Sequence, residues 1–283
     1  MPSAAAVETL PYSGESFDLA QYLARSKQLD VSDLDWESVK DYPTSETEIR
    51  CLSYMMDIEA HTLCYLRDVL NAGAGEDPEI ADFLGCWLYE ESYHGRAIER
   101  FVRAAGVERR ISVCGQHVKT PGERLEDLGT RLLSLLFPKQ FVTVYMTWGS
   151  VQEHSTLFGY TNMARQTKNP VLAELLRRIA REESRHFGFY YYKACQGLKA
   201  SRFTQVLTAW LLRLFWTPVG EGVKPKLETD FLLAHIFAGP EGEDAMDRID
   251  RTMARLPGLE RFDLMTQRYA QALERRRLGI VAA

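Results

Sequence analysis

Apolar residues recur every three or four positions along most of this chain, which is the period of an amphipathic helix. We find neither the apolar–polar alternation of strands nor a linker rich in proline and serine. Helices are expected over residues 16–28, 46–72, 78–105, 123–136, 139–166, 170–198, 202–215, 226–237, 242–255 and 259–277. Residues 1–14 are expected to form a flexible tail, and residues 15–283 a single all-α domain.

Four of the expected helices carry a glutamate inside the apolar stripe, where a core side chain is expected. Glu183, for example, lies between Ile179 and Phe187 on its stripe, and the arginines of that helix lie elsewhere. The four interrupting acids are Glu59, Glu91, Glu153 and Glu183. Burying four ionised carboxylates without partners is very costly, so this pattern indicates that something neutralises them.

Two of these glutamates are followed one helical turn later by a histidine. The segments run from Glu91 to His94 and from Glu183 to His186, and both read Glu-x-x-His. One such pair alone is typical of an exposed helix face, because positions i and i+3 are neighbours on any helix. Four carboxylates and two imidazoles from four helices are instead the ligand set of a di-iron or di-manganese centre in a ferritin-like four-helix bundle. The alternative is that protonated acids bridge one another.

The spacing of the acids fits two helical hairpins. Glu59 and Glu91 are 32 residues apart, and Glu153 and Glu183 are 30 residues apart. About 14 residues up one helix, a short turn and the same distance down the next bring two mid-helix positions level. The 62 residues between Glu91 and Glu153 then hold the long crossover of a ferritin-like fold.

Composition excludes several other classes. The net charge of −5 argues against a nucleic-acid-binding protein, which usually has a basic excess. The most apolar stretch, residues 206–219, is too short to span a bilayer, and the first residues show no secretory signal pattern. Five cysteines without a Cys-x-x-Cys pair suggest neither a zinc site nor a disulfide framework, so a reduced cytoplasmic setting is expected.

Three further residues are weaker candidates. Thr156 lies one turn after Glu153 on the same face, so its hydroxyl could face the metals or bond a backbone carbonyl. Glu182 and Trp36 could support the ligands or relay electrons, although a glutamate beside a ligand is more often exposed.

At these residues the chain resembles the soluble acyl-carrier-protein desaturases. Residues 151–168 resemble the family's third-ligand helix, which has a Gln-Glu-Arg-Ala-Thr start and an Asn-Thr-Ala-Arg-Gln stretch. Residues 90–95 resemble its Glu-Glu-Asn-Arg-His-Gly motif, and residues 182–186 resemble its Asp-Glu-Lys-Arg-His motif. The likeness covers about residues 50–200.

The resemblance implies a di-iron oxidase that uses O2 to insert a double bond into an acyl chain. The chain would be held on acyl carrier protein, in a bent apolar channel beside the two irons. A ferredoxin-type donor would supply the electrons, and the enzyme would be a homodimer. Thr156 matches a threonine that is thought to help deliver a proton during oxygen activation. A patch formed by Arg177, Arg178, Arg181, Arg185, Lys224 and Lys226 could receive the acidic carrier, although such arginines usually form a solvated face.

Tyr93, Glu182 and Phe187 depart from the family pattern, so substrate and position of oxidation stay open. One alternative is a di-iron hydroxylase or oxygenase acting on an intermediate of secondary metabolism. Arylamine N-oxygenases of this fold have an additional histidine where this chain has Ile179, which counts against them. A second alternative is a non-enzymatic iron-binding bundle.

Overall fold

The computed structural model describes residues 14–71, 73–112 and 137–281, and these residues contain helices and no β-strand. The α-helices are α1 (Leu19–Arg25), α2 (Glu46–Glu59), α3 (Thr62–Asn71), α4 (Pro78–Ala104), α6 (Pro138–Gln166), α7 (Pro170–Ala200), α8 (Arg202–Phe215), α9 (Lys226–Ile236), α10 (Pro240–Met253) and α11 (Leu264–Arg277). Two short 3₁₀ helices, η2 (Ser38–Asp41) and η3 (Ala74–Glu76), lie between them.

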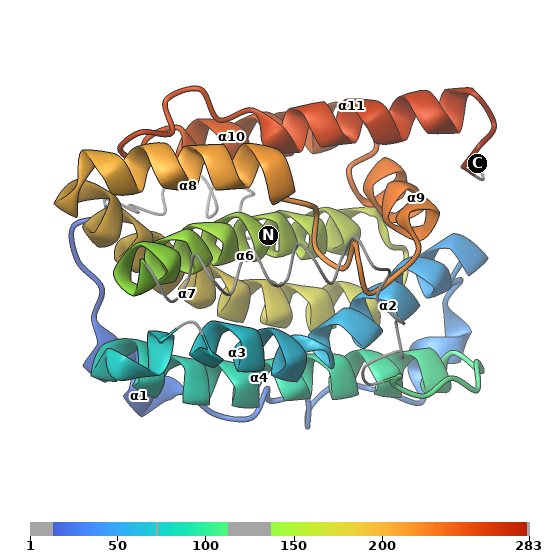
Figure 1. The fold of residues 1–283 in the computed structure, drawn as a ribbon. Helices are drawn as coiled ribbons and strands as arrows, with labels where there is room; N and C mark the ends of the chain where they lie inside the picture. Colours follow the sequence, from blue (N-terminus) through green and yellow to red (C-terminus); the bar gives the residue numbers. More distant parts are fainter. Residues whose placement is uncertain (1–13, 72, 113–136, 282–283) are drawn as a thin grey trace.

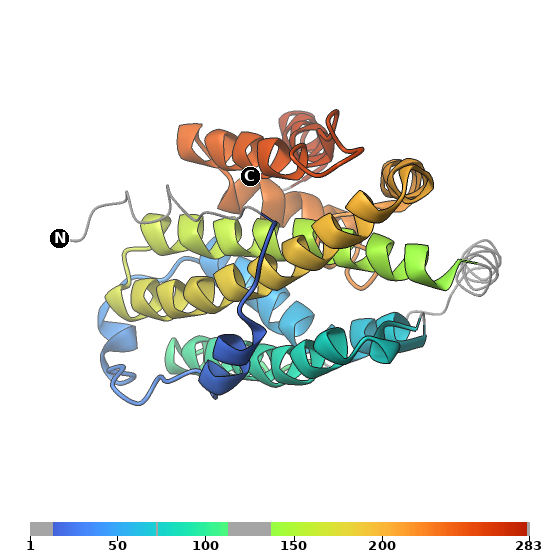
Figure 2. The same ribbon diagram turned by 90° about the vertical axis from the view of Figure 1, so that its left-hand side faces the viewer.

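Helices α2, α4, α6 and α7 form a bundle, which confirms the all-α, ferritin-like fold. Helices α6 and α7 pack together along their lengths, and α2 packs against α4 (Figure 1). Helices α8, α10 and α11 form an additional layer over α6, as Figure 1 shows at its top. The short helix α1 lies against α4 at the side of the bundle (Figure 2).

The long bundle helices begin where local chemistry favours a helix start. Helices α4, α6 and α7 each have proline at the first position, where the missing N–H costs no hydrogen bond. Asp77 caps α4 by accepting from two backbone amides, and Asn169 does the same for α7. The predicted helices 78–105, 139–166 and 170–198 agree with α4, α6 and α7 within two residues at each end. The predicted helix 123–136 lies outside the described residues.

The prediction of one helix over residues 46–72 was wrong. Helix α2 ends at Glu59 and α3 begins at Thr62, so the chain is interrupted beside a candidate ligand. The Thr62 hydroxyl donates to the Glu59 carbonyl oxygen at 2.7 Å, which satisfies a backbone acceptor that a continuous helix would use. The helix expected over 259–277 also begins later, at Leu264.

Two glycines allow the bundle helices to approach closely. A Cβ at Gly95 on α4 would lie 3.3 Å from both the Glu59 Cβ and the Met56 carbonyl oxygen on α2. A Cβ at Gly149 on α6 would lie 2.5 Å from the ring of Tyr190 on α7. Larger residues at these positions would push apart the helices that carry the four acids.

Two further findings concern the cysteines and the membrane. Cys64 is disulfide-bonded, whereas Cys51, Cys86 and Cys195 are free thiols. The bond at Cys64 was not expected from the cysteine pattern. Among the described residues, no helix is both long and apolar enough to cross a membrane.

Candidate metal centre

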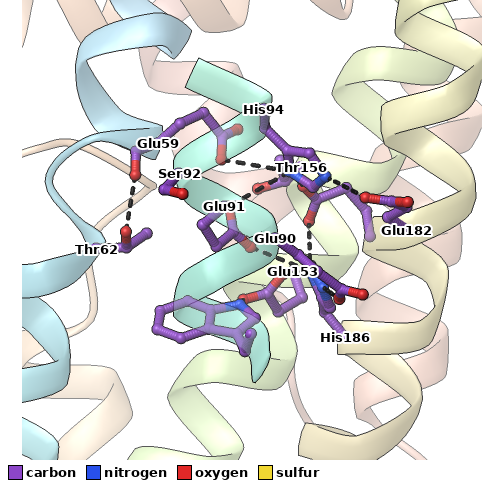
Figure 3. A network of polar contacts seen from close by, with 12 residues as sticks. Glu59, Thr62, Glu90, Glu91, Ser92, His94, Glu153, Thr156, Glu182 and His186 are labelled. Carbon is purple, nitrogen blue, oxygen red and sulfur yellow. Dashed lines mark hydrogen bonds and ion pairs between the residues drawn. The ribbon is translucent and has the colours of Figure 1, made fainter. Parts of the chain in front are cut away.

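The structure brings the six predicted ligand residues together inside the bundle. Glu59 ends α2, Glu91 and His94 lie on α4, Glu153 lies on α6, and Glu183 and His186 lie on α7. All six are buried. Figure 3 shows the labelled members of this group converging between the helices.

The donor atoms form two overlapping sets, and within each set they lie within 4.8 Å of one another. The first set is Glu59, Glu91, His94 and Glu183, and the second is Glu91, Glu153, Glu183 and His186. Glu91 and Glu183 belong to both sets. Two carboxylates shared by two neighbouring sites, with one terminal carboxylate and one imidazole for each, is the arrangement of a two-metal centre.

Both imidazoles turn the same nitrogen toward the shared carboxylates. Nδ1 of His94 lies 3.1 Å from Glu183 Oε1, and Nδ1 of His186 lies 3.0 Å from Glu91 Oε1. Nε2 of each ring points outward: that of His94 lies 2.9 Å from Glu182 Oε2, and that of His186 lies 2.8 Å from Glu90 Oε2. Because an ionised carboxylate only accepts hydrogen bonds, each Nε2 carries a proton, and the lone pair of Nδ1 would face inward once a metal ion is bound.

The atoms left without partners show that a cation fits. Nδ1 of His94, Nδ1 of His186 and both carboxylate oxygens of Glu183 are buried and have no hydrogen-bonding partner. Acceptors therefore face acceptors at the centre of the bundle, which is unfavourable without a positive charge between them. Two divalent cations would balance the four carboxylates and use the imidazole lone pairs. The cluster could therefore bind metal ions.

Without metal, protons take this role. Burial and the neighbouring charge of Glu91 raise the pKa of Glu59 well above its usual range, and burial and Glu183 do the same for the pKa of Glu153. Burial opposes a charge on the two imidazoles, but the surrounding carboxylates raise the pKa of both His94 and His186. Metal ions would displace protons from these groups.

The terminal acids are each held by an aromatic donor that the sequence analysis did not single out. Trp87 Nε1 donates to Glu153 Oε1 at 3.0 Å, and the Tyr160 hydroxyl donates to Glu59 Oε1. Both aromatic residues belong to the apolar stripes around the acids, so periodicity places them in the core. Their hydrogen bonds to the acids were not predicted.

A family model described as fatty acid desaturase matches residues 61–209, which is more than half of the chain. The chain belongs to the fatty acid desaturase family. Membership indicates an oxidoreductase, and the family usually has a di-iron centre. The chain has no match among curated proteins or among solved structures.

The match to the desaturase family covers five of the six candidate ligands and Thr156. Glu59 lies two residues before the matched region, so its place in the cluster rests on the geometry described above. The N-terminal helix α1 and the C-terminal helices α9, α10 and α11 also lie outside the match.

A cavity of about 610 Å³ reaches this centre from outside the bundle. Its wall includes all four carboxylates, Glu59, Glu91, Glu153 and Glu183, together with Thr156 and two tryptophans, Trp87 and Trp148. Beyond Thr156 lies a small recess of about 20 Å³, whose lining includes Leu232, Ile236 and Phe237. A substrate in this cavity would therefore lie against the acids while the histidines stay behind them, fully buried.

The three weaker candidates, Glu182, Trp36 and Thr156, have different hydrogen-bonding partners in the structure. Glu182 is buried and accepts from His94, so it supports a ligand. Trp36 instead donates to the Val31 carbonyl oxygen at 3.2 Å and lies under the Arg100 guanidinium, away from the histidines. The Thr156 hydroxyl donates to the Gln152 carbonyl oxygen at 2.9 Å.

The basic patch considered for carrier binding is largely occupied by internal pairs. Arg178 pairs with Asp33 and Glu174, and Lys224 pairs with the buried Asp57. Arg185 lies 3.2 Å from the buried carboxylate of Glu90. These cations therefore contribute little free positive charge to a docking surface.

Proposed function

We propose that this protein is an O2-dependent di-iron desaturase that inserts a double bond into an acyl chain bound to acyl carrier protein. The observation that carries the proposal is a cavity that ends on four buried carboxylates whose neighbouring acceptors fit two cations. An acyl chain in the cavity would run past the metal-facing wall toward the apolar recess beyond Thr156.

We assign Glu59, Glu91, His94 and Glu183 to one iron, and Glu91, Glu153, Glu183 and His186 to the other. When bound, two irons reduced by an external donor activate O2 for removal of hydrogen from an unactivated carbon chain. Glu91 and Glu183, which belong to both sets, would supply carboxylate charge to both ions. The protein also keeps each imidazole in one tautomer through Glu90 and Glu182.

The cavity residues orient the substrate and control protons. Trp87 and Trp148 provide apolar walls next to the acids, which suits an alkyl chain and limits water. Thr156 and Thr62 both line this wall with a hydroxyl that bonds a backbone carbonyl and could rotate toward the cavity, and Thr156 lies one turn after Glu153. We propose that the Thr156 hydroxyl delivers a proton toward the metals during oxygen activation.

The proposed partners follow from the reaction. Removing two hydrogens from an acyl chain while reducing O2 to water requires two electrons from outside, and we propose a ferredoxin-type donor. We also propose a homodimer. In support, α8 carries a row of roughly half-exposed large apolar side chains at helical spacing, Phe203, Val206, Trp210 and Leu214, which a second copy could cover.

A hydroxylase or oxygenase acting on an intermediate of secondary metabolism is the second candidate. Polar groups on the same cavity wall favour it, because Gln152 has a buried carboxamide oxygen without a hydrogen-bonding partner. If the Gln152 side chain rotates toward the cavity, a substrate with a hydroxyl or amide donor could satisfy that oxygen, whereas a plain alkyl chain could not.

The test is to load the protein with ferrous iron and supply O2, ferredoxin, its reductase and a panel of acyl carrier proteins. Loss of two hydrogens from an acyl product supports the desaturase. Gain of one oxygen supports the hydroxylase. An iron-loaded protein that changes no acyl chain would contradict the carrier-bound substrate, and one that also consumes no O2 would support the non-enzymatic iron-binding bundle. A protein that takes up no iron would contradict the di-iron centre itself.

A further inference from the structure

The two histidines of the candidate centre are supported unequally. Glu182, behind His94, has the His94 ring and Arg185 as its neighbours, with Arg185 Nη2 3.5 Å from Glu182 Oε1. Glu90, behind His186, is fully buried and accepts from three groups. These are His186 Nε2 at 2.8 Å, Arg185 Nη2 at 3.2 Å and the Tyr22 hydroxyl at 2.9 Å.

Arg185 contacts both carboxylates, so the difference between the two sides is Tyr22. Its hydroxyl donates to the same oxygen, Oε2 of Glu90, that receives the His186 Nε2 proton. This donor fixes the carboxylate group and reduces the negative charge that it presents to the ring. Burial raises the pKa of the Tyr22 phenol, so the group stays a donor at neutral pH.

Helix α1 holds Tyr22 firmly against the bundle. Tyr22 is buried, and its ring lies 5.1 Å from the ring of Phe83 on α4 and 6.4 Å, edge to face, from that of His186. Phe17, just before α1, contacts both Tyr22 and Phe189. The helix lies outside the region that matches the desaturase family, so this support comes from a part of the chain that the family model does not describe.

We propose that Tyr22 is a positioning residue for one of the two metal sites. It orients Glu90, and through Glu90 it fixes His186 for the site formed with Glu91, Glu153 and Glu183, while the His94 site does not depend on it. The two metal ions are therefore inequivalent. The inference rests on the proposed two-metal function and on the ligand assignment given above.

The physical reason is that an outer hydrogen bond sets both the orientation and the basicity of a metal-binding imidazole. Without the Tyr22 hydroxyl, Glu90 keeps Arg185 and the His186 ring but loses the donor that fixes Oε2. The outer partners of metal-binding histidines typically contribute about 10–100-fold to metal affinity. The Tyr22 contribution should fall at the lower end, because two other groups still hold Glu90.

The test measures Co²⁺ binding anaerobically in backgrounds that keep one site each. His94→Gln leaves the His186 site, and His186→Gln leaves the His94 site. Adding Tyr22→Phe should weaken Co²⁺ binding about 10-fold and change the visible Co²⁺ spectrum in the first background, with no change in the second. Tyr89→Phe is the matched control on an exposed tyrosine and should change neither background.

Two further variants keep the inference testable if Tyr22→Phe disturbs folding. Glu90→Gln should weaken the His186 site alone, and Glu182→Gln should weaken the His94 site alone. Equal effects of Tyr22→Phe in both backgrounds, or no effect in either, would overturn the proposal. A parent protein that binds no Co²⁺ or Fe²⁺ would refute the proposed function itself, whereas two bound ions with an indifferent Tyr22→Phe variant would refute only the role of Tyr22.

Discussion

Two clusters of buried charged side chains in this molecule are neutralised in different ways. Between helices α9 and α11, the fully buried Asp230 of α9 pairs with Arg268 at 2.5 Å and with Arg275 at 2.7 Å, both on α11. Arg268 in turn pairs with Glu221 at 2.7 Å. Every charge in this cluster has an opposite charge from the same chain.

The acids between α4 and α7 have no such partners. The described residues place no lysine or arginine beside Glu91 and Glu183, and without metal only protons and the two imidazoles supply positive charge there. The comparison teaches how to distinguish a structural charge cluster from a binding site. A cluster whose acidic and basic side chains pair with one another stabilises the fold. A cluster of acids without such basic partners is neutralised by bound protons or metal ions.

The largest effect is expected when a shared acid or an imidazole is removed from the candidate metal centre. Glu91→Ala should abolish bound iron and turnover, because Glu91 serves both sites. His186→Ala should abolish turnover and remove the ion of the second site, while the His94 site remains. Helix content should stay largely intact, since α4 and α7 have long apolar faces. Iron analysis, turnover and circular dichroism measure the three results. Persistence of iron and activity in both variants would mean that the ligand assignment is wrong.

The next test compares the two clusters for stability in metal-free protein. Asp230→Asn should lower the free energy of unfolding by about 3 kcal/mol, because Arg268 then keeps only Glu221 and Arg275 loses its carboxylate partner. Glu183→Gln should change it by less than about 1 kcal/mol or raise it, since the four clustered acids exceed in charge the two imidazoles beside them. Urea denaturation gives both values, and Glu274→Gln on the surface is the control. Equal losses for Asp230→Asn and Glu183→Gln would remove the distinction between the clusters.

Metal ions should stabilise the candidate metal centre and have no effect on the cluster around Asp230. A divalent ion at about 100 times its dissociation constant stabilises a one-site protein by about 2.7 kcal/mol, which corresponds to a Tm increase of roughly 5–10 °C at this size. Differential scanning calorimetry with anaerobic Fe²⁺ should show this increase in the parent and in Asp230→Asn. A chelator should reverse it. An increase of the same size in Glu91→Ala would place the ion elsewhere.

The smallest effect is expected at the cavity wall. Thr156→Ala should keep both metal ions, because the Thr156 hydroxyl bonds a backbone carbonyl and no candidate ligand. The oxygen consumed per product should rise by roughly several-fold, since a proton donor is lost from the cavity. Thr156→Ser should restore coupling. An unchanged ratio of oxygen to product would leave Thr156 with only its backbone hydrogen bond.

Much of the centre could be predicted because its residues obey helical periodicity. Each acid occupies a core position on its own helix, and each Glu-x-x-His pair lies on one face, so local patterns were sufficient to group all six. The interruption after Glu59 was missed because Leu63 and Leu66 continue the apolar spacing across it. The cause is a side-chain hydrogen bond from Thr62, which periodicity does not report.

The groups behind the histidines were harder to predict. Glu90 and Glu182 each precede a ligand glutamate, and adjacent positions on a helix point about 100° apart, which suggests exposure. Tyr22 acts on Glu90 across 68 positions of sequence, and no local pattern connects them. Such contacts depend on how α1 packs on α4, which is a tertiary property.

Because α2 ends at Glu59, one of the four acids of the candidate metal centre lies at a helix end and not inside a helix. Glu91, Glu153 and Glu183 lie within helices of 27, 29 and 31 residues, so the backbone at each of them moves only when a long helix moves. Glu59 is attached to a chain that leaves the helix at the next residue, beside the cavity. Of the four carboxylates, Glu59 is therefore the one whose backbone can shift without moving a long helix.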